Sequence, residues 1–259
     1  MTRPVFDDVA PSYDAAFTET PLGMHLRRAV WRWLDAAFPP DSLVLELNCG
    51  TGADALHLLE RGVRLVATDA SAAMLDVARA KCDAYIQRGS LELRELPVER
   101  LDTLHATPAA FAGAFSNFGG LNCVRDLNRV AASLATVLES GAHFIACIMG
   151  PLVPWEWGWY LARGDVRRAF RRLRPDGAEW HGLPVFYPTI GAVRRAFAPW
   201  FRLQGRGALG VLLPPTFASA WTGRHPALLD RLASLERRIE RWPLMSRLAD
   251  HYIVDLVRR

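Results

Sequence analysis

Residues Leu45 to Gly52 read LELNCGTG, an apolar run that ends in two closely spaced glycines. The amphipathic segment 53–61 follows directly, so the pattern predicts a strand, a tight turn and a helix. At such a turn, unpaired backbone N–H groups face outward and glycine lets a ligand approach them closely. Asp69 ends the next apolar run, where an acid can bind ribose hydroxyls. The glycine pair alone is a weak signal, because a tight turn with a capping acid also explains it.

The alternation of strands and helices continues on both sides of this stretch. The predicted strands are 43–47, 64–69, 91–96, 111–117, 143–150, 201–213 and 249–259. The predicted helices are 22–38, 53–61, one capped by Ser71, 125–138, one capped by Thr189, and one near 226–242. Residues 6–14, FDDVAPSYD, are expected to form a loop or a short turn. Strands that alternate with helices predict a parallel, doubly wound α/β sheet, which here ends in an antiparallel hairpin.

Composition excludes several classes of protein. The 259 residues, 51% hydrophobic and 22% charged, are typical of a globular enzyme with one domain and insertions. The net charge of +4 comes from arginines interspersed with acids, so we expect no nucleic-acid partner. The arginine-rich segment 163–174 is expected to form an exposed helix face.

Cysteine usage and hydropathy point to the cytoplasm. The four cysteines, Cys49, Cys82, Cys123 and Cys147, lie far apart, which argues against a zinc site and a disulfide framework alike. No run approaches the roughly 18 apolar residues of a membrane span, and the first residues lack the apolar core of a signal peptide. We therefore predict a cytoplasmic protein without a metal site.

The stretch VLELNCGTGADALHLLERGVRLVATDASAAMLDVARAK, residues 44–81, resembles the cofactor-binding half of class I S-adenosylmethionine (SAM)-dependent methyltransferases. The resemblance covers residues 41–150, and the terminal hairpin matches the family's sheet. A dinucleotide dehydrogenase more usually has a third glycine where this chain has Ala55. The resemblance implies SAM as the cofactor and a Rossmann-like, mostly parallel seven-stranded sheet whose last strand is antiparallel, with helical and aromatic cap insertions.

The resemblance also implies which residues contact the cofactor. Glu46 matches the acid near its amino group, the loop passes under its methionine and ribose, and Asp69 accepts from its ribose hydroxyls. The full set is Tyr13, Glu46, Asn48, Cys49, Gly50, Thr51, Gly52, Asp69, Ala70, Met74, Pro97, Val98, Glu99, Ser116 and Asn117. Met74 is alternatively a plain core residue. Asn48 stands where the family often has glycine, and asparagine tolerates the left-handed conformation such a turn needs.

Four regions are expected within one structural domain: a helical lid (1–40), the SAM-binding core (41–150), a substrate cap (151–188), and the end of the sheet (189–259) with a second cap at 214–247. The caps are rich in large aromatics, which favours a small apolar or aromatic acceptor. The predicted substrate contacts are Trp155, Trp159, Tyr160, Tyr187 and Trp221. The alternative is that these rings pack the insertions onto the sheet.

Methyl transfer depends mainly on alignment, and a base is needed only if the acceptor must lose a proton. The predicted catalytic residues are His181, Asn117 and Asn122, with His251 and His225 as further bases or as structural histidines. The SNFGGLN after the fourth strand lacks the Asn/Asp-Pro-Pro-aromatic pattern of many enzymes that methylate amino groups of bases. The expected activity is thus methylation of a small hydrophobic metabolite at O, C or N. A SAM-fold enzyme that cyclises, decarboxylates or rearranges its substrate, and a silent SAM-fold binding protein, are the alternatives.

Overall fold

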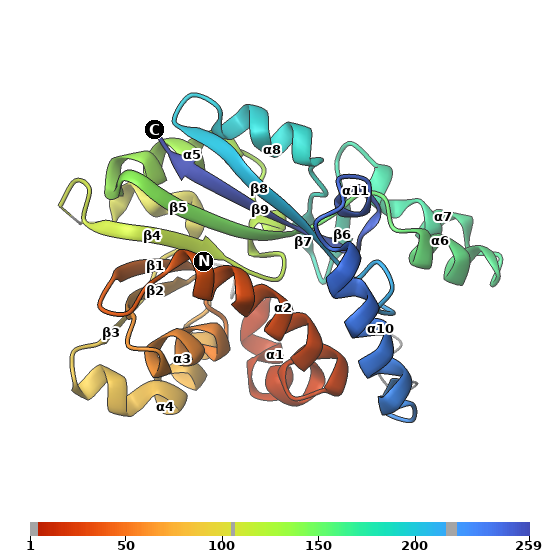
Figure 1. Cartoon of the computed structure of the whole chain (residues 1–259), viewed down its shortest axis with the longest axis horizontal. Coiled ribbons are helices and arrows are strands. Elements are labelled where there is room, and N and C mark those ends of the chain that lie inside the picture. The colour runs from red at the N-terminus through yellow and green to blue at the C-terminus, as the bar shows by residue number, and fades with distance from the viewer. Residues whose placement is uncertain (1–4, 105–106, 216–221) are drawn as a thin grey trace.

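A computed structural model describes residues 5–104, 107–215 and 222–259, and its centre is a seven-stranded sheet in the order β3-β2-β1-β4-β5-β9-β8 (Figure 1). The strands are β1 (Leu43–Leu47), β2 (Arg64–Asp69), β3 (Leu91–Glu95), β4 (Phe111–Ser116), β5 (Leu138–Met149), β8 (Phe201–Leu209) and β9 (His251–Arg258). Strands β1 to β5 pair in parallel, and β9 runs antiparallel to both β5 and β8. The predicted fold class is therefore confirmed.

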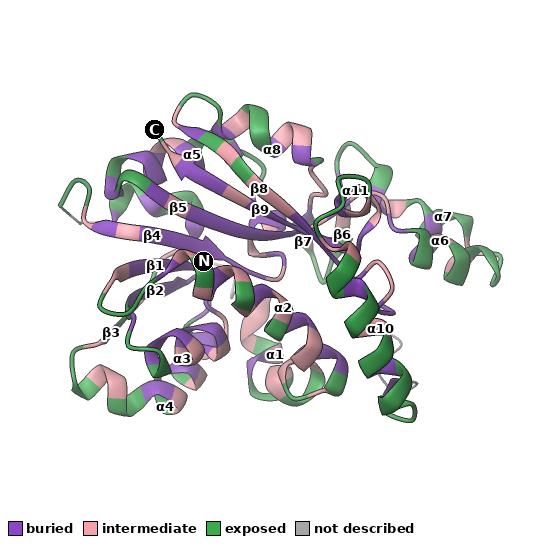
Figure 2. Cartoon of the chain, in the orientation of Figure 1, coloured by how far each residue is buried: buried purple, intermediate pink, exposed green. Residues whose placement is uncertain are grey.

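Helices cover both faces of the sheet (Figure 1). One face carries α2 (Pro21–Ala37), α3 (Ala53–Glu60) and α4 (Ala72–Gln87), and the other carries α5 (Leu127–Val137) and α8 (Ile190–Phe197). Side-chain oxygens of Thr20, Ser71, Asp126 and Thr189 accept backbone N–H bonds at the starts of four of these helices. Strands β1, β2, β4 and β9 are mostly buried, whereas the edge strands β3 and β8 are partly exposed (Figure 2). Each sheet face has its own apolar core.

The prediction of a loop at residues 6–14 is wrong. This segment forms α1 (Phe6–Tyr13), and the π-helix η1 (Asp14–Thr18) continues it. Pro11 lies inside α1, and a proline there removes a helical hydrogen bond. The helix persists because α1 packs along α4 and Asp7 and Asp8 favour its N-terminus. Tertiary contact therefore overrides the local signal.

The prediction of one exposed helix in the arginine-rich segment is also wrong. After α6 (Pro154–Leu161) the chain forms the short α7 (Val166–Ala169) and the 3-10 turn η4 (Arg171–Leu173). Arg172 is only 7% exposed, because its guanidinium bonds to the buried Glu156 and Asp250. A small hairpin, β6 (Ala178–Trp180) and β7 (Leu183–Val185), completes this arm, which extends from the end of the sheet (Figure 1).

The remaining elements are short or lie at the edges. The 3-10 turns η2 (Val98–Thr103) and η3 (Gly120–Cys123) flank β4. Helix α10 (Pro226–Ile239) ends before the predicted 242, and α11 (Met245–Leu248) follows Pro243. In the described ranges, no helix combines the length and apolar character needed to cross a membrane.

Candidate functional site

The two glycines of the loop have different surroundings. Gly50 (φ 55°) and Gly52 (φ 75°) both adopt the left-handed conformation. A Cβ on Gly52 would lie 2.9 Å from the Cβ of Ala78, so this glycine allows close packing of α3 against α4. A Cβ on Gly50 would meet nothing within 4 Å. Gly50 is therefore the point where the backbone of the loop borders open space, as a ligand-binding turn requires.

Asp69 holds this loop in place. Its Oδ2 accepts the N–H of Gly50 at 2.8 Å, and its Oδ1 accepts the N–H of Ser71 at 2.9 Å. Burial raises the pKa of Asp69, and these backbone hydrogen bonds act in the opposite direction. Each carboxylate oxygen retains a second lone pair that can accept from a ribose hydroxyl. Asp69 can therefore hold the loop and bind a ribose at the same time.

Asn48 has a packing role that the sequence does not reveal. It takes the left-handed conformation (φ 57°), and its Oδ1 accepts from the Ser116 hydroxyl at 3.3 Å. A Cβ on Gly120 would lie only 2.5 Å from the Cβ of Asn48. The missing side chain of Gly120 thus makes room for Asn48, and the pair joins the loop to the end of β4.

Two buried acceptors at this edge lack donors. Among the residues that the structure describes, Oε2 of Glu46 and Oδ1 of Asn117 have no hydrogen-bond partner, and both residues are buried. Burial, reinforced by the nearby charge of Asp54, raises the pKa of Glu46 well above its usual range. Buried acceptors normally have donors, so this pair fits a ligand that carries N–H groups and positive charge.

Asp54, in the first turn of α3, joins the loop to helix α2. Its Oδ1 accepts from Arg27 Nη1 at 2.9 Å and from Trp31 Nε1 at 2.7 Å, and its Oδ2 accepts from Asn117 Nδ2 at 3.0 Å. Asp54 and Arg27 were not among the predicted site residues. An acid placed two residues after the second glycine was the only local signal for this network.

The N-terminal helices are fastened over the loop by three polar contacts. The Ser71 hydroxyl donates to Asp7, the Thr51 hydroxyl donates to Asp14 at 2.7 Å, and Lys81 Nζ also lies 2.7 Å from Asp14. Burial would raise the pKa of Asp14, but the hydrogen bonds from Lys81 and Thr51 hold it below its usual value. The structure therefore brings α1 and η1 to the predicted cofactor loop. The Thr51 hydroxyl donates its hydrogen bond to Asp14.

Aromatic rings cluster next to Asn117. Phe17 contacts Tyr13 at 5.9 Å and Phe118 at 5.1 Å between ring centroids, and Phe118 contacts His251 at 6.0 Å. The Arg27 guanidinium lies 4.9 Å from the Phe118 centroid. Burial raises the pKa of Tyr13, so its hydroxyl stays neutral at ordinary pH. These rings form an aromatic wall (Tyr13, Phe17, Phe118, His251) between the lid and β9.

Two of the three predicted catalytic residues, His181 and Asn122, do not lie on the aromatic wall. His181 is exposed at the tip of the β6–β7 hairpin, and its ring contacts Trp180 at 4.6 Å. Trp180 in turn contacts Phe6 of α1 at 5.2 Å, so the hairpin touches the lid. Asn122 is fully buried, with its Nδ2 on the carbonyls of Phe186 (2.6 Å) and Met149 (3.1 Å) and its Oδ1 on the Met149 N–H. Its amide therefore ties the cap to β5 and is not free for an acceptor.

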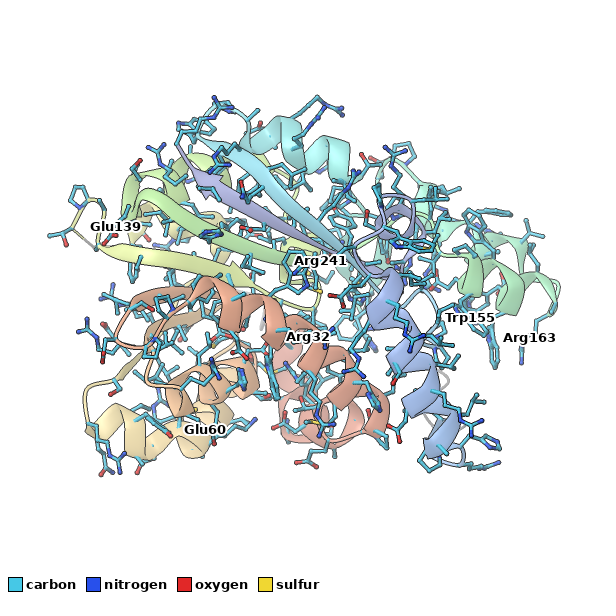
Figure 3. The ribbon with its side chains drawn as sticks, in the orientation of Figure 1. Arg32, Glu60, Glu139, Trp155, Arg163 and Arg241 are labelled. Carbon is cyan, nitrogen blue, oxygen red and sulfur yellow. The ribbon has the colours of Figure 1, made fainter. Side chains whose placement is uncertain are left out.

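The predicted substrate aromatics divide into two groups. Tyr160 accepts from Arg171 at 3.3 Å, and Arg172 lies 5.1 Å from the Tyr187 ring, so both tyrosines join the buried arginine network. Trp155 and Trp159 are 45% and 38% exposed. Trp155 donates to the Val211 carbonyl, and the Arg163 guanidinium lies over the Trp159 ring. Figure 3 labels Trp155 and Arg163 on the arm. Trp221 lies outside the described residues.

The other predicted cofactor residues surround the loop at different depths. Cys49 has a buried side chain and donates its N–H to Thr68. Met74 is buried, Ala70 is half-buried, Pro97 precedes η2, Val98 packs in the core and Glu99 is exposed. Their contacts with the cofactor stay predictions. Within the described parts of the chain, no group of three or more His, Cys, Asp or Glu side chains is placed to hold a metal ion.

Comparison with known proteins finds methyltransferases. The model of a family described as a methyltransferase domain matches residues 44–141. A demethylmenaquinone methyltransferase of Thermobifida fusca is 30% identical over 216 residues, 78% of this chain and 87% of the relative. A 2-phytyl-1,4-naphtoquinone methyltransferase of Thermosynechococcus vestitus is 33% identical over 54% of this chain and 60% of its own.

Solved structures share the fold. The geranyl diphosphate C-methyltransferase of Streptomyces coelicolor, solved with S-adenosylhomocysteine, superposes with a TM-score of 0.60 at 12% identity, over 90% of this chain and 79% of its own. The [4+2]-cyclase SpnF superposes with a TM-score of 0.57 at 14% identity, over 100% of this chain and 97% of its own. At these identities the likeness establishes the fold alone.

Proposed function

Because the chain belongs to the class I SAM-dependent methyltransferases, we propose that it methylates a small hydrophobic molecule with an aromatic or quinone-like ring. The proposal is carried by two buried oxygens, Glu46 Oε2 and Asn117 Oδ1, at the carboxyl ends of β1 and β4 beside the aromatic wall. Neither oxygen has a donor within the described ranges of the chain. This site joins two buried acceptor oxygens, which suit a cation, to aromatic side chains, which suit a ring.

The residues present fit SAM. Its ammonium group supplies the donors that Glu46 and Asn117 lack, and its ribose hydroxyls suit the free lone pairs of Asp69. When bound, SAM supplies a methyl group activated by the sulfonium charge. The chain's own part is to hold the acceptor in line and to exclude water, and the fastened lid of α1 and η1 serves both purposes.

The acceptor lies, in this proposal, against the aromatic wall. Flat rings pack well on the faces and edges of Phe17 and Phe118, and Arg27 adds positive charge beside Phe118. The quinone substrates named for two relatives have rings of this kind, which supports the choice of acceptor class.

Where the acceptor must lose a proton, His251 is better placed than His181 to accept it. His251 borders Phe118, and its Nδ1 lies 3.0 Å from Asp250 Oδ2. Arg172 Nη2 lies 2.6 Å from Oδ1, the other carboxylate oxygen of Asp250. Burial by itself would raise the pKa of Asp250, but the charges of Arg172 and His251 hold this pKa far below its usual range. The ionised Asp250 therefore lies beside the imidazole and helps to fix its position in the site.

The test has two parts. Calorimetric titration of the full chain with SAM and S-adenosylhomocysteine should show binding, and Asp69→Asn should weaken it. The protein is then incubated with SAM and reduced naphthoquinones or simple phenols, and mass spectrometry seeks products heavier by one CH2. Binding without any such product across ring acceptors would contradict the acceptor class. A product of unchanged mass would instead identify cyclisation or rearrangement.

A variant separates the role of His251 from general damage. His251→Asn should lower turnover and remove the acidic limb of the pH–rate profile while S-adenosylhomocysteine affinity stays unchanged. His181→Asn, on the exposed hairpin tip, is the matched control and should keep the wild-type profile. An unchanged profile in His251→Asn would remove His251 as the base.

A further inference from the structure

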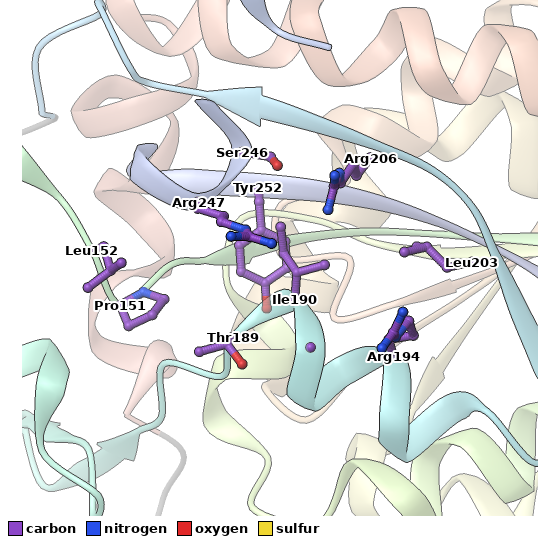
Figure 4. Close-up of a pocket in the computed structure, with 11 residues that line it drawn as sticks. Pro151, Leu152, Thr189, Ile190, Arg194, Leu203, Arg206, Ser246, Arg247 and Tyr252 are labelled. Carbon is purple, nitrogen blue, oxygen red and sulfur yellow. The ribbon is translucent and has the colours of Figure 1, made fainter. Parts of the chain in front are cut away.

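A cavity lies between α8, β8 and α11. Its volume is about 380 Å³, and three arginines from three different elements surround it: Arg194 of α8, Arg206 of β8 and Arg247 of α11. Figure 4 shows the three arginines on different sides of the opening, with Ile190 and Tyr252 between them. The cavity thus has an apolar floor and a cationic rim.

This cavity is separate from the reaction centre. His251 contacts Phe118 of the aromatic wall, whereas the next residue, Tyr252, lines the cavity. Successive residues of a strand point to opposite faces of the sheet, so β9 itself divides the two sites. Arg206 lies on the cavity side, between two glycines whose other side is covered by Trp33. A ligand here would not be the methyl acceptor.

The positive charge of the rim is uncompensated. In the described part of the chain, the guanidinium groups of Arg194, Arg206 and Arg247 make no ion pair or hydrogen bond with another side chain. Residues 189–209 and 241–249, which supply most of the lining, contain no Asp or Glu. The acids that follow, Asp250 and Asp255, are already paired with Arg172 at 2.6 Å and His143 at 2.7 Å.

We propose that this cavity binds an amphipathic phosphate ester, with its phosphate among the three arginines and its hydrocarbon part against Leu152, Ile190 and Tyr252. Guanidinium groups bind phosphate oxygens through paired N–H donors. The charge of three arginines suits a ligand with a doubly charged phosphate better than a ligand with one carboxylate. The first N–H groups of α8 add positive potential at the same end. The apolar floor suits a hydrocarbon chain, which a polynucleotide lacks.

The experiment uses the full chain saturated with S-adenosylhomocysteine, so that the cofactor site is filled. Calorimetric titration with n-octyl phosphate, below its critical micelle concentration, should show binding, and inorganic phosphate and octyl glucoside should each bind at least about tenfold more weakly. Arg206→Gln and Arg194→Gln should each weaken octyl phosphate binding about tenfold. Arg202→Gln, on the same strand but outside the cavity, should bind like the wild type.

Several outcomes would overturn the proposal. Equal affinity of the wild type, Arg206→Gln and Arg194→Gln for octyl phosphate would show that the ligand binds elsewhere. Inorganic phosphate as tight as octyl phosphate would remove the apolar part of the assignment. Binding of a single-stranded oligonucleotide that is lost in Arg202→Gln as well would indicate a nucleic-acid surface. Unchanged S-adenosylhomocysteine affinity in every variant shows that the fold is intact.

A last comparison separates two sources of the ester. Cosedimentation of the wild type, but not of Arg206→Gln, with vesicles that contain phosphatidic acid would identify a membrane lipid. Binding of octyl phosphate without cosedimentation would identify a soluble phosphate ester. Both results support the assigned chemistry.

Discussion

The two loop glycines offer a sharp test, because alanine at each position should damage a different property. Both residues are left-handed, so alanine at either costs about 1–2 kcal/mol of backbone strain. At Gly52 the new Cβ would lie 2.9 Å from Ala78 Cβ, well inside the normal contact of about 3.5–4.0 Å. Shifting α4 to relieve this contact adds roughly 1–3 kcal/mol. At Gly50 the new Cβ enters open space.

Gly52→Ala should therefore lower the free energy of unfolding by about 2–5 kcal/mol, and Gly50→Ala by about 1–2 kcal/mol. Cofactor binding should show the reverse order. The Cβ of Gly50→Ala occupies the space over the loop backbone, so S-adenosylhomocysteine affinity should fall by about tenfold or more. Gly52→Ala, studied under conditions where it is fully folded, should lose less affinity. Urea denaturation measures the first quantity and calorimetric titration the second.

Gly89→Ala is the matched control for strain alone. Gly89 is also left-handed (φ 71°), a Cβ there meets nothing within 4 Å, and the residue lies after α4, away from the loop. It should lose stability like Gly50→Ala and keep wild-type affinity. The reasoning is refuted if Gly50→Ala binds S-adenosylhomocysteine like Gly89→Ala, or if Gly52→Ala is no less stable than the other two variants.

Three further predictions concern buried charges. The pKa of Glu46 in the folded protein lies well above its ordinary 4.5, so between these two pKa values the folded protein binds more protons than the unfolded chain. The free energy of unfolding without cofactor therefore falls as pH rises through this interval. Glu46→Gln should flatten this fall in urea titrations from pH 4 to 8, and it should weaken S-adenosylhomocysteine binding about tenfold. Arg27→Met leaves the carboxylate of Asp54 without its arginine and should lower the free energy of unfolding by about 3 kcal/mol. The double variant Arg27→Met/Asp54→Asn should lose less free energy of unfolding than the two single variants together. Losses that add up would refute the coupling of the two residues. Glu236 accepts backbone N–H groups of residues 210–213, so Glu236→Gln should lower the urea midpoint by an amount equivalent to about 2 kcal/mol, and an unchanged midpoint would contradict that role.

Local signals predicted the central part of the fold well. The apolar run before the glycines became β1, Ser71 and Thr189 capped their helices, and Asp69 met the loop through Gly50. These features depend on neighbours in sequence or on adjacent parallel strands, whose carboxyl ends share one edge. The same edge brought Ser116 and Asn117 to the loop.

Long-range contacts account for the errors. Helix α1 is polar and contains Pro11, yet Asp7 meets Ser71 and Asp14 meets Lys81, partners that are 64 and 67 positions away. Arg172 looked like one surface arginine among many, but its partner Asp250 is 78 positions away. Such pairs leave no periodic trace in the sequence.

The sequence by itself therefore determined the sheet, the turn after β1 and the family, because periodicity, helix capping and glycine conformations act over a few residues. Only the tertiary structure decided that Gly50 borders open space while Gly52 packs on Ala78, and that Asn48 is accommodated by Gly120. It also decided that Oε2 of Glu46 is buried without a donor from the described part of the chain. Burial and partner choice depend on which distant segments meet, and that is settled by packing rather than by any local pattern.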